Sequence, residues 1–181
     1  IMSRRSSTVS LQQRAKRAPI QSLSSEYLRV WLPNGRKGKR MRYYIVDDEI
    51  GVVKTLENII QKRLGGTVDG YETNPAEARR EILQIKPDVL LVDFLMTEMD
   101  GVTLVKQLRG QLPQTSFIML SKVSDKSMVE QAYQAGIEFF ISKPINLVEI
   151  ESVLKNVEER RKASDLLSNI QDMFHAQDSA K

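Results

Sequence analysis

The stretch that decides the fold is YYIVDDEIG, which runs from Tyr43 to Gly51. Four bulky, mostly apolar residues are followed at once by three consecutive acids at positions 47–49. A continuous run of this kind is typical of a strand that is buried on both faces of a sheet. A second stretch, PDVLLVDFLMTEMDG from Pro87 to Gly101, repeats the pattern and reaches its acid at Asp93. Together they predict two neighbouring strands that end at one shared pocket.

Apolar strands alternate with amphipathic helices around these two stretches. The predicted strands cover residues 42–46, 67–71, 89–92, 116–120 and 139–141, and the predicted helices cover 50–63, 75–85, 102–111, 126–135 and a last helix that begins after Asn146. Asn146 with Glu149 three residues later predicts a capping box at that last helix. Five strand–helix alternations in one domain favour a parallel sheet that is covered by helices on both faces.

The charge of the chain is distributed unevenly. Residues 1–40 carry ten of the 27 Lys and Arg but one of the 23 acids, so the net charge of +4 comes from this segment and the rest of the chain is acidic. We expect residues 1–40 to be a basic leader that is disordered, or that was added by cloning or upstream read-through. A transit peptide is the alternative, because such leaders are rich in Arg and Ser.

The composition also excludes several classes of protein. The chain has no cysteine, which excludes disulfides and thiolate metal sites. No apolar run approaches the roughly 18 residues that a membrane-spanning helix needs. We therefore expect a cytoplasmic protein without membrane contact.

Polar groups follow the predicted strands at one end of the sheet. Asp47 and Asp48 follow the first strand, Asp93 the third and Ser121 the fourth, and Lys143 stands just after the fifth. Ligands of open α/β sheets bind at this edge. Neighbouring carboxylates disfavour one another's ionisation, and Mg²⁺ prefers oxygen ligands, so the three aspartates predict a magnesium site.

A phosphoryl group fits the same residues. A cation with open positions and the ammonium of Lys143 can neutralise phosphoryl oxygens, Ser121 can donate a hydrogen bond to them, and Asp93 can form an aspartyl-phosphate. Each residue alone has a simpler interpretation as a helix cap, a turn residue or a surface lysine. All of them together at one sheet edge favour the functional interpretation.

Four motifs carry a resemblance to a known family. The motifs are VDDE at 46–49, LLVDFLMTEMDG at 90–101, IMLS at 118–121 and FFISKP at 139–144. In order and spacing the chain resembles the receiver domain of bacterial two-component response regulators, over about residues 42–158. This implies a flavodoxin-like α/β fold, a doubly wound parallel sheet of five strands in the order 2-1-3-4-5. More weakly, residues 135–154 resemble the glutamine-responsive type of regulator of Gram-positive bacteria.

The resemblance implies a role for each matching residue. Asp93 is expected to be the phosphoacceptor, and Lys143 to contact the phosphoryl group through its ammonium. The implied Mg²⁺ ligands are Asp48 directly, Asp47 mostly through water, Asp93, and the backbone carbonyl of Leu95.

The resemblance also implies a switch and marks two departures. Ser121 and Phe140 match the hydroxyl–aromatic switch pair, and the Lys143–Pro144 peptide bond matches one that is typically cis. Thr97 stands where the family usually has proline, so we expect a less rigid loop there. Lys122 replaces a small residue, and we expect it to cover part of the phosphoryl group and to change how fast water reaches it.

The implied partners extend beyond these residues. The resemblance implies phosphorylation by a sensor histidine kinase, and control of DNA through an output domain that is absent from this chain. We expect residues 41–158 to form the receiver and 159–181 a linker helix or tail, which otherwise packs back or frays. A homodimer could use that helix or the face of the fourth helix, fifth strand and last helix.

Three other interpretations share parts of this pattern. A phosphatase that forms an aspartyl-phosphate would place DxD after the first strand, whereas Asp47 and Asp48 are adjacent. A flavin-binding module would need a Ser-, Thr- or Gly-rich loop there. A receiver-like module that works without phosphorylation is the third. We expect no enzyme activity beyond self-catalysed phosphotransfer and dephosphorylation.

Overall fold

The computed structural model describes residues 40–122 and 125–178, without the side chains of 169 and 172–178. The expected leader therefore lies outside the described residues, except for Arg40. The elements are β1 Arg42–Val46, α3 Ile50–Ile59, the π-helical turn η2 Ile60–Leu64, β2 Thr67–Glu72, α4 Pro75–Ile85, β3 Val89–Asp93, α5 Gly101–Arg109, β4 Ser116–Ser121, α6 Lys126–Ala135, β5 Phe139–Ser142 and α7 Leu147–Asp178.

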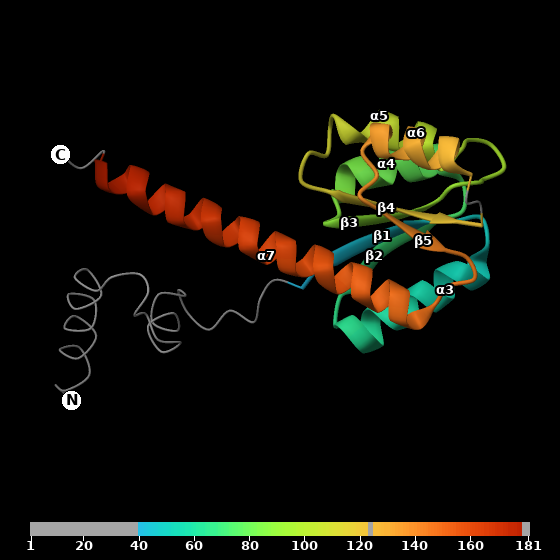
Figure 1. The fold of residues 1–181 in the computed structure, drawn as a ribbon, viewed down its shortest axis with the longest axis horizontal. Helices are drawn as coiled ribbons and strands as arrows, with labels where there is room; N and C mark the ends of the chain where they lie inside the picture. The colour runs from blue at the N-terminus through green and yellow to red at the C-terminus, as the bar shows by residue number, and fades with distance from the viewer. Residues whose placement is uncertain (1–39, 123–124, 179–181) are drawn as a thin grey trace. The chain divides into compact units, whose positions relative to one another are not determined.

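The five strands form one parallel sheet in the order β2-β1-β3-β4-β5 (Figure 1). This confirms the predicted fold class and strand order. Helices α4, α5 and α6 cover one face, and α3 and α7 cover the other. Successive residues of β3 alternate between the two cores, with Leu90 and Val92 on the first face and Val89 and Leu91 on the second. The doubly covered strands explain the continuous apolar runs of the sequence.

Helix ends follow the capping chemistry of the sequence, with three corrections. The helix predicted over residues 50–63 changes at Ile60 into a π-helical turn, which ends at Gly65 in the left-handed region with a φ of 67°. The helix predicted over 102–111 spans Gly101–Arg109 instead. At the last helix, Asn146 accepts from the backbone of Val148 and Glu149, as expected for a cap. Glu149 does not complete the capping box, because its carboxylate accepts from Ser142 N at 3.4 Å.

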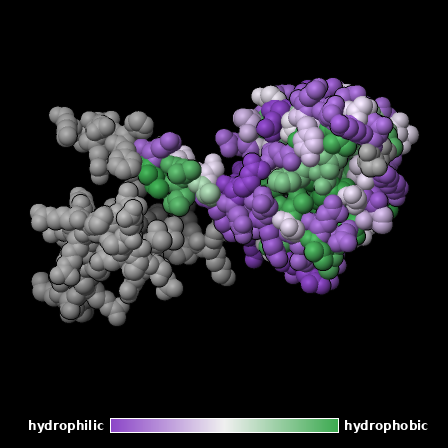
Figure 2. All heavy atoms as spheres, viewed as in Figure 1, coloured by the Kyte–Doolittle hydropathy of each residue, from purple (hydrophilic) through white to green (hydrophobic). Residues whose placement is uncertain are grey.

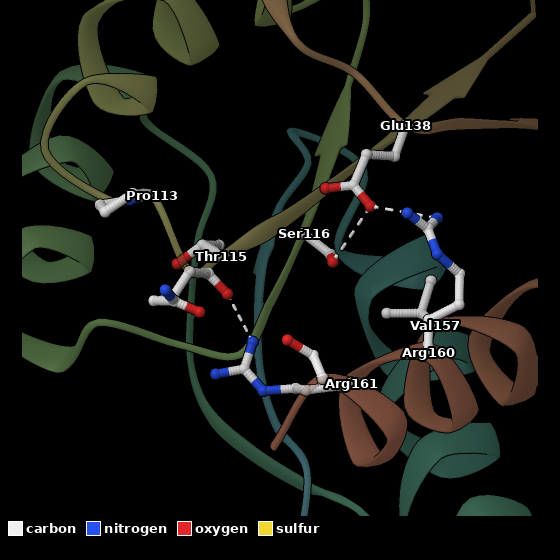
Figure 3. Close-up of a pocket in the computed structure, with 9 residues that line it drawn as sticks. Pro113, Thr115, Ser116, Glu138, Val157, Arg160 and Arg161 are labelled. Atoms are coloured by element: carbon white, nitrogen blue, oxygen red, sulfur yellow. Dashed lines mark hydrogen bonds and ion pairs between the residues drawn. The ribbon is translucent and has the colours of Figure 1, made fainter. Parts of the chain in front are cut away.

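Helix α7 leaves the sheet at a pair of arginines. Its first turns bury Ile150, Leu154 and Val157 in the core. Arg161 Nη2 then lies 2.8 Å from Asp88 Oδ1, and Arg160 Nη1 lies 3.6 Å from Glu138 Oε2. Figure 3 shows both arginines around a cavity of about 190 Å³ at the amino-terminal edge of the sheet. The arginines that interrupt the apolar pattern of the sequence therefore anchor the helix to the domain.

Beyond the arginines α7 extends away from the sheet (Figure 1). Its described side chains there are solvent-exposed, including the apolar Leu166, Leu167 and Ile170. Figure 2 shows an apolar patch on this projecting part, separate from the domain, whose face in that view has an apolar area surrounded by hydrophilic residues. The projecting helix thus carries apolar side chains that the domain does not cover.

Candidate functional site

The predicted polar residues meet at the carboxyl-terminal edge of the sheet. Asp47 follows β1, Asp93 and Ser121 are the last residues of β3 and β4, and Lys143 follows β5. The loop after β3 returns closely onto this edge, and a Cβ added to Gly101 would lie 2.2 Å from the backbone oxygen of Asp93. Only glycine fits at that position, so residue 101 helps to fix the loop that surrounds the site.

Lys143 is the centre of the site. Its side chain is 2% exposed, and its Nζ lies 2.8 Å from Asp47 Oδ2 and 3.1 Å from Asp93 Oδ1. The same ammonium lies 3.2 Å from Glu49 Oε1. One buried cation therefore faces three carboxylates, which leaves an excess of negative charge.

Burial sets the protonation of these groups. It is the largest cause that raises the pKa of Asp93 to about 6, and the nearby Asp47 carboxylate adds to the rise while Lys143 opposes it. Burial also raises the pKa of Asp47 above its usual range. Burial lowers the pKa of Lys143, but its close contacts with the Asp47 and Asp93 carboxylates outweigh burial and the net pKa is raised. At neutral pH Asp93 is thus ionised and can act as a nucleophile.

The carboxylates at the end of β1 fit a divalent cation. Oxygens of Asp47, Asp48 and Glu49 lie within 4.8 Å of one another. Asp47 is fully buried, and its Oδ2 accepts no hydrogen bond of normal geometry, although the ammonium of Lys143 is near enough to form an ion pair. A buried carboxylate oxygen without an aligned donor is suited to a hard cation.

The structure arranges the expected ligands differently from the sequence-based set. Glu49, rather than Asp93, shares the compact group with Asp47 and Asp48. Asp93 joins that group through Lys143. Leu95 lies in the loop after β3 with a 55% exposed side chain, and the role of its backbone carbonyl stays a prediction.

Two side chains tie the surrounding loops to the acids. Thr97 Oγ1 donates a hydrogen bond to Asp48 Oδ2 at 3.2 Å, so the residue that replaces the usual proline contacts a candidate ligand. Lys122 Nζ donates to Glu49 Oε1 at 2.8 Å. Glu49 is a site residue that the sequence-based set does not include, and the signal that could have found it is its place as the third consecutive acid after β1.

The expected switch residues lie on neighbouring strands. Ser121 is buried, and its carbonyl accepts from the backbone N–H of Lys143 at 2.8 Å. Phe140 is half-buried and packs edge-to-face against Tyr133 of α6, with ring centroids 5.3 Å apart. The Lys143–Pro144 peptide bond is cis, as expected. The hydroxyl and the aromatic ring are thus on adjacent strands of the edge that carries the site.

A comparison with known families matches this arrangement. Residues 44–155 match the response regulator receiver domain. The chain belongs to this family. Receiver domains are phosphorylation-dependent signalling domains, so the family gives the chain its general function.

Individual relatives agree with the assignment as a receiver. The chain is 37% identical over 132 residues to the transcriptional regulatory protein GlnL of Bacillus subtilis, covering 72% of this chain and 42% of GlnL. It is 34% identical to the chemotaxis protein CheY of Thermotoga maritima, covering 66% of this chain and 98% of that one. A two-component response regulator from Clostridium difficile, 21% identical, has the same fold with a TM-score of 0.63, covering 67% of this chain and 98% of that one.

Two further findings concern the extent of the match to GlnL and the helices of the described residues. The match spans less than half of the length of GlnL. Within residues 40–122 and 125–178, no helix is both long and apolar enough to cross a membrane.

Proposed function

We propose that Asp93 accepts a phosphoryl group from a sensor histidine kinase. The observation that carries this proposal is Lys143, whose buried ammonium contacts both Asp93 and Asp47. A lysine in this position can contact the phosphoryl group on Asp93 and at the same time neutralise part of the negative charge of the carboxylates. The raised pKa of Asp93, about 6, leaves the carboxylate ionised at neutral pH without making it a poor nucleophile.

The acids around Asp93 are proposed to hold Mg²⁺. Asp47, Asp48 and Asp93, with the backbone carbonyl of Leu95, would be its ligands, and the compact group of carboxylate oxygens at the end of β1 supports the choice of a cation. When bound, the ion supplies neutralisation of charge on phosphoryl oxygens. Glu49 is near enough to Asp47 and Asp48 to join this set directly or through water.

The proposed reaction needs few protein groups. An oxygen of Asp93 attacks phosphorus, the P–N bond of a phosphohistidine breaks, and its electron pair stays on the imidazole. Lys143 neutralises the phosphoryl oxygens during transfer, as phosphoryl transfer demands. Hydrolysis of the acyl phosphate returns inorganic phosphate and the free carboxylate. We propose no turnover of external substrates.

The switch and its output are proposed on the same edge. After phosphorylation the hydroxyl of Ser121 would move toward the phosphoryl oxygens and Phe140 would turn inward, which disturbs its edge-to-face contact with Tyr133. The face made by α6, β5 and α7 would then change its affinity for partners. Control of transcription through an output domain is proposed from the likeness to GlnL, a transcriptional regulatory protein. A response to glutamine is proposed from the resemblance of residues 135–154 alone.

The projecting helix supports a dimer as one such partner. Leu166, Leu167 and Ile170 of α7 are exposed apolar residues at helical spacing. Two copies could bury them against each other, as helices with an apolar seam do. The proposed dimer uses this seam or the face of α6, β5 and α7.

Phosphorylation by a small donor tests the central proposal. The protein is incubated with Mg²⁺ and acetyl phosphate, and intact-mass spectrometry should show one added phosphoryl group. Asp93→Asn should lose it. Asp100→Asn is the matched control, because Asp100 caps α5 with a side-chain oxygen that asparagine retains. Unchanged phosphorylation in Asp93→Asn would refute the assignment, and hydrolysis of generic phosphate esters would favour the phosphatase interpretation.

A further inference from the structure

Glu49 connects a lysine inside the pocket with a lysine at its mouth. Its Oε1 lies 3.2 Å from the buried Lys143 Nζ and 2.8 Å from Lys122 Nζ. Lys122 follows β4, and its side chain is 63% exposed. All three residues line a cavity of about 490 Å³ beside the site. The ion pair of Glu49 and Lys122 therefore lies beside Lys143, the lysine that contacts Asp93.

Fold stability does not account for this ion pair. Exposed ion pairs contribute little to stability, because water and salt screen them. Lys143 already has Asp47 and Asp93 as partners, so it does not need Glu49 to balance its buried charge. The pair also joins loops that are 73 residues apart in sequence, unlike the pair of Lys54 and Glu57 within α3. The ion pair of Glu49 and Lys122 instead determines where the Lys122 ammonium lies near the site.

We propose that Glu49 is a positioning residue that holds Lys122 beside the pocket and releases it to the phosphoryl group once Asp93 is phosphorylated. This proposal rests on the proposed function of Asp93. A phosphoryl group carries a charge of roughly −1.5 to −2, more than the carboxylate that it replaces, so it competes with Glu49 for the nearby ammonium.

Once moved, Lys122 would protect the acyl phosphate. Hydrolysis requires water to attack phosphorus in line with the Asp93 oxygen that leaves. The P–O bond to the acyl group then breaks, and its electron pair returns to the Asp93 carboxylate. A side chain on the solvent side of the phosphoryl group obstructs that approach. The position of Lys122 thus sets the lifetime of the phosphorylated state.

The lifetime of the acyl phosphate tests the proposal. The whole chain is phosphorylated with acetyl phosphate and Mg²⁺, the donor is removed, and the phosphorylated fraction is followed by intact-mass spectrometry. Lys122→Met keeps the length of the side chain but removes its charge, and should shorten the half-life roughly fivefold, about 1 kcal/mol in the barrier. Lys122→Arg should restore most of the half-life. Lys54→Met, which breaks an exposed pair elsewhere, should have no effect.

A double variant separates this role of Glu49 from others. Glu49→Gln should lengthen the half-life, because Lys122 no longer has a competing partner. In Glu49→Gln/Lys122→Met the half-life should equal that of Lys122→Met alone. An effect of Glu49→Gln that persists without Lys122 would mean that Glu49 acts on the cation or on Lys143, and would overturn the proposal. So would an unchanged or longer half-life in Lys122→Met. If the wild-type chain takes up no phosphate at all, the proposed function itself fails.

Discussion

The two edges of the sheet use the same kinds of side chain in opposite ways. At the amino-terminal edge each acid has at least one arginine, with Asp88 2.8 Å from Arg161 and Glu138 3.6 Å from Arg160 and 3.7 Å from Arg109. At the carboxyl-terminal edge a single buried lysine serves three carboxylates, and one buried carboxylate oxygen lacks an aligned donor. The first arrangement is balanced and holds a helix in place. The second is unbalanced, and that imbalance is what attracts a cation and a phosphoryl group.

Because these charges are buried, the difference between the two edges affects the free energy of folding. A buried ion pair with good geometry and additional hydrogen bonds recovers much of its cost of desolvation, whereas buried charges in excess do not. Asp88 has both the guanidinium of Arg161 and the backbone N–H of Arg42 as donors. Burial instead raises the pKa values of Asp47 and Asp93. Removing a negative charge at the carboxyl-terminal edge should therefore stabilise the fold, whereas removing a positive charge at either edge should destabilise it, which the following variants test.

Loss of the central lysine should have the largest effect. Lys143→Met leaves the buried Asp47 and Asp93 without their lysine, while Glu49 keeps Lys122. Breaking a buried pair in this way costs about 3–5 kcal/mol. We expect this fall in the free energy of unfolding in urea at pH 7.5, with part of it recovered on adding Mg²⁺. Lys54→Met, at an exposed pair, is the control. A loss that Mg²⁺ does not reduce would argue against an excess of negative charge.

Removing a charge from the phosphoacceptor should stabilise the fold. The pKa of Asp93 rises from 3.8 to about 6 on folding, so its charged form is disfavoured in the native state. This penalty is absent below pH 4, grows as the pH rises through the interval between the two values, and is complete above pH 6. By linkage it amounts to at most about 3 kcal/mol. Asp93→Asn should thus be more stable than wild type at pH 7.5 without Mg²⁺, and equal to it near pH 3.5.

Urea unfolding at the two pH values measures this difference. Mg²⁺ should stabilise wild type more than Asp93→Asn. The difference in the free energy of unfolding between the two proteins at pH 7.5 should then shrink or change sign. Asp100→Asn is again the control, since its carboxylate lies at the start of α5. A less stable Asp93→Asn protein at pH 7.5 would contradict the proposed imbalance.

Breaking a pair at the opposite edge should destabilise instead. Arg161→Met leaves the buried Asp88 without its guanidinium, and we expect a loss of about 1–3 kcal/mol because Arg161 is itself partly exposed. Phosphorylation by acetyl phosphate should stay unchanged, since the site lies at the other edge. The neighbouring Arg160→Met, at an exposed arginine, should cost less than half as much. Equal losses in both variants, measured by urea unfolding, would show that the buried pair has no special role.

The sequence predicted one edge of the sheet better than the other. The polar residues at the carboxyl-terminal edge follow directly after apolar strands, so the periodicity that predicts β1 and β3 also places Asp47 and Asp93. The partners of Arg160 and Arg161 lie far away in sequence, and nothing local distinguishes these arginines from a break in an apolar stripe. Glu49 differs, because its place as the third consecutive acid after β1 is a local signal and only its contact with Lys122 spans 73 residues.

The helices show the same limit on a smaller scale. The Asn146 cap acts on the next few residues, so the start of the last helix could be predicted from the sequence. The π-helical turn at Ile60–Leu64 depends on a change of hydrogen-bond register that the apolar spacing does not reveal. Interactions between residues close in sequence can thus be predicted from the sequence, whereas contacts between residues that only the folded structure brings together cannot.

The smallest effect is expected at the loop that departs from the family pattern. Thr97 Oγ1 donates to Asp48 Oδ2 at 3.2 Å in an exposed position, and should help to orient that carboxylate for a cation. Thr97→Val keeps the shape and removes the donor. We expect Mg²⁺ to bind about threefold more weakly by calorimetric titration, the change that one exposed hydrogen bond makes. Thr103→Val removes a similar bond, 2.9 Å from Thr103 Oγ1 to Asp100 Oδ2 at the start of α5, and should leave the affinity unchanged. Tighter binding in Thr97→Val would mean that the hydroxyl competes with the cation for Asp48 instead of orienting it.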